Sequence, residues 1–225
     1  MGNGDSIQRV QADVVACGRC PRLVAWREEV AREKRAAFRK WEYWGKPVPG
    51  FGDPAARLVV VGLAPAAHGG NRTGRVFTGD RSGDWLYAAL HRAGYASQPT
   101  SEHREDGLRL TGAYVTAVVH CAPPANKPTT EERDNCVPYL QRELELLQEW
   151  RVMVALGSFA HGAVASLLGL RPRPAFGHGS EAAVVGGRVL LGSYHPSQQN
   201  TFTGKLTEPM LDAVLARARE LTGDR

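Results

Sequence analysis

Short apolar runs alternate with amphipathic segments along this chain, and the alternation predicts an α/β fold. Continuous apolar stretches at residues 57–65 and 151–157 are typical of buried strands. Residues 111–124 indicate another strand that runs into a loop. Because helical segments separate these strands, we expect one α/β domain with a mostly parallel central sheet.

Helical periodicity and end signals place the predicted helices between the strands. They cover residues 82–94, 129–150, 158–169 and about 205–221. Ser82 is the expected N-cap of the first helix and Gly94 its stop signal. Thr129 and Glu132 have the spacing of a capping box at the start of the second helix, whereas Pro138 should bend or interrupt it.

Three loops follow predicted strands at residues 62–80, 120–128 and 194–200. The third belongs to a predicted hairpin over 181–197, which Gly186 and Gly187 close and whose second arm delivers His195 to a strand end. Ligands bind at the carboxyl ends of strands in parallel sheets. If neighbouring strands present these loops on one edge, the three converge on a single site.

The composition is that of an ordinary soluble globular protein. Of 225 residues, 43% are hydrophobic and 23% are charged. No basic and apolar leader follows Met1, and no apolar run approaches the roughly 20 residues of a membrane span. We therefore expect a cytoplasmic protein without membrane contact. In that reducing compartment, four cysteines favour a metal site or reactive thiols over disulfides.

Positive charge is concentrated near the N-terminus. Nine Lys and Arg and four Glu lie between Arg19 and Lys46, and the difference of +5 equals the formal net charge of the whole chain. Aromatic residues are interspersed at Trp26, Phe38, Trp41, Tyr43 and Trp44. Such a stripe suits a polyanion, since Lys and Arg displace counterions from phosphates. The alternative is an amphipathic helix with a solvated basic face and an aromatic core face.

The cysteines form two pairs of different spacing. Cys17 and Cys20 are a C-x2-C pair, and fourteen residues separate Cys121 from Cys136. Four thiolates can bind tetrahedral zinc or a cubane iron-sulfur cluster, although the second pair lacks the spacing of a zinc ribbon. The alternative is four separate buried cysteines that pack as small hydrophobic side chains.

The stretch "GLAPAAHGGNRTGRVFTGD" at 62–80 is rich in glycine, which allows close approach of the backbone to a ligand. Arg72 and Arg75 are candidates for phosphate contacts. Asp80 is the one carboxylate of the loop, so it is the candidate for orienting a water molecule, with a helix N-cap as the alternative. In "SYHPSQQN", His195 at a strand end can donate a hydrogen bond to developing negative charge.

Taken together, the motifs "GLAPAAHG", "GRVFTGD", "CAPPANKP" and "SYHPSQQN" and the four cysteines resemble the uracil-DNA glycosylase superfamily. They most resemble its iron-sulfur branch, called family 5 or B-type, from Cys17 to about Met210. The resemblance implies a three-layer α/β/α sandwich. It also implies one glycosylase domain over 1–225, with a cysteine-containing basic helical segment at about 10–46.

The resemblance also implies roles for individual residues. Cys17, Cys20, Cys121 and Cys136 would bind a 4Fe-4S cluster that anchors the "CAPPAN" loop. Asn126 would bind the edge of the base, Phe77 would stack on it, and His195 would stabilise charge on its O2. The backbone from Gly62 to Ala66, including Ala64, would line the pocket, and Ser197, Gln198 and Gln199 would contact DNA.

One departure from the better-known superfamily members concerns the first motif. Where they carry an acidic or amide residue, this chain has the apolar Leu63 and Ala64, as the B-type branch does. The water-positioning role then passes to Asp80. A less discriminating pocket fits the acceptance of other deaminated bases, such as hypoxanthine and xanthine, besides uracil.

The expected activity is hydrolysis of the N-glycosidic bond in DNA by a monomer, which leaves an abasic site. Lys127 is the one lysine in the three loops, so we expect no lyase activity. Two alternatives belong to other classes. One is a noncatalytic metal-containing module that binds flipped or single-stranded bases. The other is a zinc protein with unrelated small-molecule chemistry.

Overall fold

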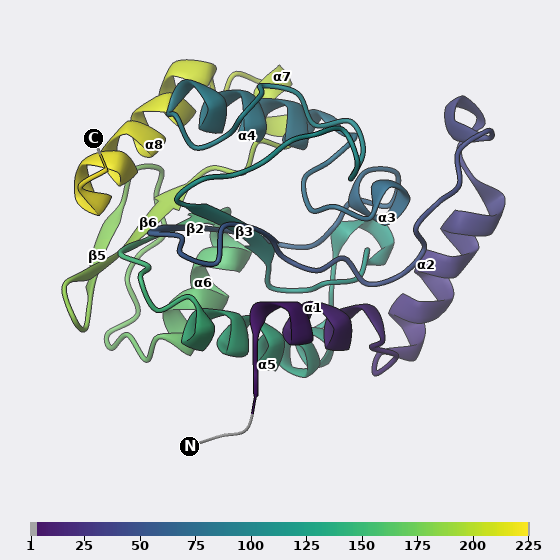
Figure 1. Cartoon of the computed structure of the whole chain (residues 1–225), viewed down its shortest axis with the longest axis horizontal. Coiled ribbons are helices and arrows are strands. Elements are labelled where there is room, and N and C mark those ends of the chain that lie inside the picture. Colours follow the sequence, from purple (N-terminus) through teal and green to yellow (C-terminus); the bar gives the residue numbers. More distant parts are fainter. Residues whose placement is uncertain (1–3, 225) are drawn as a thin grey trace.

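The computed structural model describes residues 4–224 and consists of a six-stranded sheet between two layers of helices (Figure 1). The expected three-layer α/β/α fold is therefore confirmed. In chain order the strands are β1 (Phe51–Gly52), β2 (Leu58–Gly62), β3 (Ala113–Ala117), β4 (Val152–Leu156), β5 (Glu181–Val184) and β6 (Arg188–Ser193). Their spatial order is β1-β3-β2-β4-β6-β5.

The four inner strands run parallel to one another, as predicted. Strand β2 lies between β3 and β4, and Val60 is in register with Val115 on one side and Val154 on the other. Strand β6 pairs in parallel with β4, whereas the short edge strands β1 and β5 are antiparallel to their neighbours. The carboxyl ends of β3, β2, β4 and β6 consequently share one edge of the sheet, and the loops that leave them meet there.

Helices cover both faces of the sheet (Figure 1). One layer contains α1 (Ile7–Val15), α5 (Thr130–Leu146) and α6 (Ser158–Leu167), and the other contains α4 (Arg81–Arg92) and α8 (Glu208–Thr222). The remaining helices are α2 (Pro21–Glu33), α3 (Gly70–Thr73) and α7 (Gln198–Phe202). Between residues 4 and 224, none of the helices combines the length and the apolar composition that crossing a membrane requires.

Strand β2 shows why the inner strands are apolar without interruption. Its side chains alternate between two hydrophobic cores, with Leu58 and Val60 on the side of α4 and α8, and Val59 and Val61 on the side of α1, α5 and α6. All four are fully buried. Complete burial of such a side chain stabilises the fold by about 1.5–3 kcal/mol. A strand with helices on both faces therefore gains from apolar residues at every position.

Helix ends agree with the sequence in most places and differ in two. The capping box of Thr129 and Glu132 forms at the start of α5, and Gly94 follows the end of α4 with φ 80°. Ser82 was the wrong N-cap, because the carboxylate of Asp80 accepts the N–H of Gly83 and starts α4. The expected interruption at Pro138 does not occur, since α5 continues through it.

Candidate active site

A cavity of about 550 Å³ opens at the carboxyl edge of the parallel strands. Its walls come from the segment after β2, the residues before and at the start of α4, the turn after β3 and the segment after β6. Ala64, Phe77, Asn126 and His195 all line it. The three loops that the sequence singled out therefore converge on one site.

The ring of Phe77 forms a wall of this cavity and is held tightly from behind. A Cβ at Gly62 would lie 2.6 Å from Cζ of Phe77, so glycine at the end of β2 leaves the space that the ring occupies. Gly83 likewise leaves room for the carbonyl of Phe77. Phe77 has φ 50°, an unfavourable conformation for an aromatic residue. Backbone strain of this kind is typical of functional sites whose surroundings fix one side chain.

Asp80 combines the two roles that the sequence left open. Its Oδ1 accepts the N–H of Gly83 at 3.0 Å and caps α4, while its side chain also lines the cavity. The carboxylate lies so close to Gly69 that any Cβ there would overlap Oδ2. Burial raises the pKa of Asp80, although backbone hydrogen bonds oppose the shift. A carboxylate in such a setting binds a proton more readily than an exposed aspartate does.

His195 lies two residues beyond the end of β6. Its backbone carbonyl accepts a hydrogen bond of 2.9 Å from Nδ2 of Asn200, which fixes the turn. The imidazole lies 5.7 Å from the ring of Phe77, at 32° to it. Burial lowers the pKa of His195 to about 4, so the ring is neutral near pH 7. Within residues 4–224 the ring makes no hydrogen bond, which leaves its N–H for a bound ligand.

Asn126 lines the cavity from a single 3-10 turn, Pro124–Asn126. Ala125 and Asn126 have φ of 52° and 56°. Asparagine adopts this left-handed conformation more easily than most residues. The carbonyl of Lys127 accepts a hydrogen bond of 3.1 Å from Arg22 in α2, so the N-terminal segment supports the turn. The amide of Asn126 is exposed at the cavity and free to meet a polar ligand edge.

The predicted phosphate contacts of Arg72 and Arg75 are wrong. Both side chains are buried, at 3% exposure, and neither is placed to contact phosphate. Arg75 makes a two-point ion pair with Asp106, with distances of 2.9 and 2.6 Å. Arg72 donates to the carbonyls of His68 and Gly79, and its guanidinium packs against the rings of Phe38 and Trp41. Asp106 and the two aromatic rings are remote in sequence, so a glycine-rich loop alone could not indicate them.

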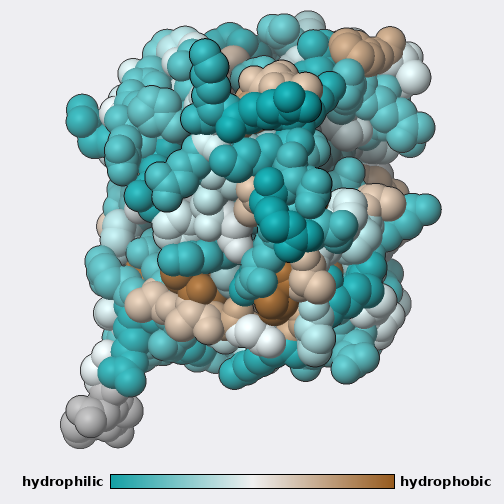
Figure 2. Space-filling model, turned by 90° about the vertical axis from the view of Figure 1, so that its right-hand side faces the viewer, coloured by the Kyte–Doolittle hydropathy of each residue, from teal (hydrophilic) through white to brown (hydrophobic). Residues whose placement is uncertain are grey.

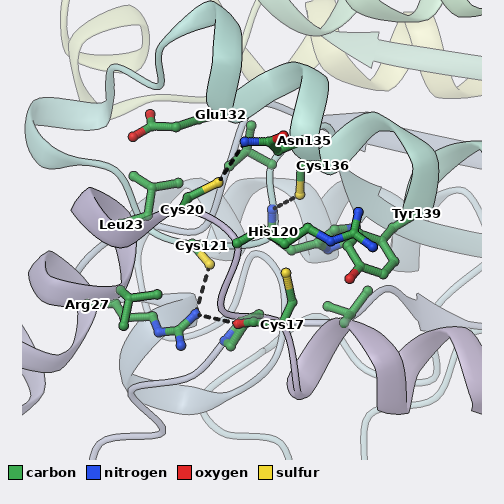
Figure 3. A pocket seen from close by; sticks show the side chains of 15 residues that line it. Cys17, Cys20, Leu23, Arg27, His120, Cys121, Glu132, Asn135, Cys136 and Tyr139 are labelled. Atoms are coloured by element: carbon green, nitrogen blue, oxygen red, sulfur yellow. Dashed lines mark hydrogen bonds between the residues drawn. The ribbon is translucent and has the colours of Figure 1, made fainter.

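The four cysteines line a second, small cavity of about 20 Å³, and Figure 3 shows their sulfur atoms around a common space. Cys17 and Cys20 lie in the connection between α1 and α2, Cys121 follows β3, and Cys136 lies within α5. No three or more His, Cys, Asp or Glu residues among 4–224 are grouped closely enough to hold a metal ion. A 4Fe-4S cubane would bind each of the four thiolates to a different iron.

Polar groups around the cysteines fit an anionic group in this cavity. Arg27 donates to Sγ of Cys121 at 3.1 Å, and the backbone N–H of His120 donates to Sγ of Cys136 at 3.2 Å (Figure 3). Nε of Arg27 and Nε2 of His120 are buried without a partner in the described chain. Burial raises the pKa of Cys121 to about 11, so the neutral thiol leaves the buried charge of Arg27 with one ion-pair partner among residues 4–224, the exposed Glu28 at 3.9 Å. Thiolates bound to iron would compensate that charge.

Comparison with known proteins identifies the family. Residues 49–219 match the family described as Uracil DNA glycosylase superfamily, which is more than half of the chain. The chain belongs to the uracil-DNA glycosylase superfamily. A type-5 uracil-DNA glycosylase of Thermus thermophilus is 56% identical over 93% of this chain and 95% of its own length. A type-5 uracil-DNA glycosylase of Mycobacterium leprae is 53% identical over 99% of this chain and 98% of its own length. One of Pyrobaculum aerophilum is 50% identical over 91% of this chain and 88% of its own length. The branch that the motifs predicted is therefore confirmed.

In this family member, the cavity contains most of the residues that the sequence singled out, and also some that it missed. Ser197, Gln198 and Gln199 lie on the rim, and Ser197 also caps α7. Gly62 does not line the cavity but lies behind Phe77. Leu63 and Pro65 line it as part of the predicted stretch from Gly62 to Ala66, and the residues missed are Arg81, Ser82 and Ala125. Ala125 precedes Asn126, and Arg81 and Ser82 directly follow Asp80, so closeness in sequence to these two residues was the signal that could have identified them.

Proposed function

We propose that this chain removes uracil from DNA by hydrolysing its N-glycosidic bond and leaves an abasic site. The observation that carries the proposal is the convergence of Phe77, Asp80, Asn126 and His195 on one cavity at the carboxyl edge of the sheet. Family membership and the activity named for the relatives support it. We further propose that it acts in the cytoplasm as a single-domain monomer.

The base enters this cavity only after it leaves the DNA stack, which costs a few kcal/mol and least at a mismatch. The flat face of Phe77 would then replace part of the lost stacking. The amide of Asn126 offers one donor and one acceptor, which match the O4 and N3–H groups of uracil. Cytosine presents the reverse pattern at the same edge, an amino donor and a ring-nitrogen acceptor, so it would require the amide in the flipped orientation.

Bond cleavage develops charge at two places, and the cavity has one residue for each. As the bond between C1′ and N1 breaks, its electron pair passes to the base, and the neutral imidazole of His195 would donate to O2. Asp80 would orient a water molecule toward C1′ and accept its proton as the new C–O bond forms. No lysine lines the cavity among residues 4–224, which agrees with hydrolysis without lyase chemistry.

We also propose that Cys17, Cys20, Cys121 and Cys136 bind a 4Fe-4S cluster. The sulfur donor set, the buried guanidinium of Arg27 and the unpaired Nε2 of His120 support this cofactor. When bound, the cluster would cross-link the N-terminal connection, the segment after β3 and α5. Since Asn126 follows Cys121 by five residues, such a cross-link would hold the base-binding turn in place.

Small side chains at the first motif support a broader substrate range. Ala64 and Ala66 contribute no polar side chain to this part of the cavity wall. We therefore propose that hypoxanthine and xanthine are also released. Both are purines that share a carbonyl beside a ring N–H, the same edge that Asn126 would recognise in uracil.

End-labelled duplexes test the proposal, each with one U:G, hypoxanthine:T or unmodified pair. Protein purified without oxygen should produce strand cleavage of the modified duplexes only after alkali. Cleavage before alkali would instead indicate lyase activity. Intact binding without any alkali-labile product would favour the noncatalytic DNA-binding module.

Two histidine variants test whether His195 takes part in uracil release. His195→Ala should slow uracil release by roughly 100- to 1000-fold, the effect of losing one preorganised donor. His91 is exposed on α4, and His91→Ala should leave the rate unchanged. Equal rates for the two variants would remove His195 from the mechanism.

A further inference from the structure

The segment between α2 and β1 carries an exposed cluster of cations that the site described above does not use. We call residues 34–46 the basic arm, which projects at the end of the molecule beside α3 (Figure 1). Lys34, Arg35, Arg39, Lys40 and Lys46 face one acidic residue, Glu42, so the arm carries a net charge of 5 − 1 = +4. We propose that the basic arm binds the phosphate backbone of the DNA duplex next to the extruded nucleotide.

The cations of the arm are free to bind a partner. Arg35, Arg39 and Lys40 are exposed, and no carboxylate among residues 4–224 pairs with them. Neighbouring Arg32 is instead paired with Glu33. Figure 2 looks at the side of the molecule that carries α2 and the arm, and hydrophilic side chains cover most of it. Unpaired surface cations are the groups that release counterions from DNA.

The arm is held in place by Arg72, the residue that the sequence analysis assigned to phosphate. Its guanidinium lies 3.9 Å from the ring centre of Phe38 and 4.2 Å from that of Trp41. The two rings meet edge to face at 80°, and both attract the buried cation through their π systems. Phe38 and Trp41 of the basic stripe therefore pack against Arg72 rather than nucleic acid bases.

The same contacts fix the arm relative to the active site. Arg72 also donates to the carbonyl of Gly79, which precedes Asp80, at 2.6 Å. Backbone N–H groups of Trp44 and Gly45 donate to the carbonyls of Arg72 and Asn71 in α3, both at 3.0 Å. The arm is thus attached to the loop that forms one wall of the base-binding cavity. DNA that places a nucleotide in the cavity passes close to its cations.

The occupant that fits is a duplex phosphate backbone. The carboxylates of an acidic protein could also bind these cations. However, the arm adjoins a cavity that we assign to a base in DNA, and a single DNA ligand can occupy both the cavity and the arm. This inference rests on the proposed function for that reason. The chemistry of Lys and Arg beside such a cavity is sequence-independent phosphate binding, which positions the duplex without reading bases.

Two matched triple variants test the proposal. The arm variant is Arg35→Gln, Arg39→Gln and Lys40→Gln. The control variant is Arg9→Gln, Arg109→Gln and Arg151→Gln, which removes the same charge from exposed positions away from the arm. Arg109 and Arg151 precede β3 and β4, at the edge of the sheet opposite the cavity. Binding is measured with a fluorescent duplex that carries a stable abasic-site analogue, over about 50–200 mM salt.

The arm variant should bind on the order of 100-fold more weakly at about 0.1 M salt, and the slope of log K against log salt should fall by about 2.7, or 0.9 for each lost phosphate contact. The control should change affinity by less than about threefold with the slope intact. With saturating enzyme, both variants should release uracil in a single turnover at the rate of the unmodified protein. Equal losses in the two variants, or an unchanged slope in the arm variant, would overturn the inference.

Failure of the arm and failure of the glycosylase assignment have different outcomes. If the unmodified protein releases no uracil, the proposed function is lost whatever the variants bind. If it releases uracil and the arm variant binds as the control does, only the arm inference is lost.

Discussion

Asp80 allows catalysis and helix capping to be separated by two substitutions at one position. Asp80→Asn keeps an oxygen that can accept the N–H of Gly83, and asparagine is as good an N-cap as aspartate. Asp80→Ala removes the cap, which costs about 1 kcal/mol and lowers Tm by about 2–4 °C in a chain of this size. Both variants lack a carboxylate for the water molecule. Loss of such a group slows a reaction roughly 100- to 10,000-fold, or about 2.7–5.4 kcal/mol.

Asp80→Asn should not lower the stability of the folded protein at pH 7. Because burial raises the pKa of Asp80 in the folded protein above its unfolded value, ionisation favours the unfolded state as pH rises through that range. At pH 7 a neutral amide removes this penalty, so Asp80→Asn should melt no lower than the unmodified protein. Single-turnover uracil release and thermal denaturation measure the two effects. Thr207, the exposed N-cap of α8, supplies the control, since Thr207→Ala should lower Tm without changing the rate. Uracil release by Asp80→Asn within about threefold of the unmodified rate would refute the catalytic role and leave Asp80 a cap.

Three further predictions concern other parts of the structure. Arg75→Met leaves Asp106 buried without its ion-pair partner and should destabilise the fold by about 3–5 kcal/mol in chemical denaturation. Because Arg75 is not expected to contact phosphate, the salt slope of DNA binding should stay unchanged at a temperature where the variant is folded. Gly62→Ala should displace the ring of Phe77 and lower kcat/KM. Gly177→Ala is the control, because its new Cβ would lie 3.7 Å from the nearest neighbour, and its kcat/KM should not change. Equal kcat/KM for the two variants would contradict the packing argument. The raised pKa of Asp80 predicts that activity falls on acidification at a higher pH than an exposed aspartate would give, and a pH–rate profile of Asp80→Asn that retained this limb would assign it to another group.

Some parts of the fold could be predicted because the relevant signal is local. The apolar run of β2 indicated a buried strand, and the capping box at Thr129 marked the start of α5. The positions of the three loops followed from the parallel order of the strands, so the convergence of Phe77, Asn126 and His195 was accessible from the sequence.

Other features depend on contacts between residues that are distant in sequence. Arg75 finds its carboxylate 31 residues later at Asp106. Phe38 and Trp41 surround Arg72, which comes more than 30 residues after them. Composition indicated a basic aromatic stripe but could not divide it into exposed cations and aromatic anchors. The strained backbone of Phe77 and the glycines behind it likewise become visible only in three dimensions.

The most direct test of the central claim is chromatographic detection of the base that leaves a U:G duplex in a single turnover. We expect free uracil in a one-to-one ratio with alkali-labile sites, an intact strand before alkali, and no release from a duplex without uracil. DNA that binds at the cavity and retains all of its uracil would contradict the account.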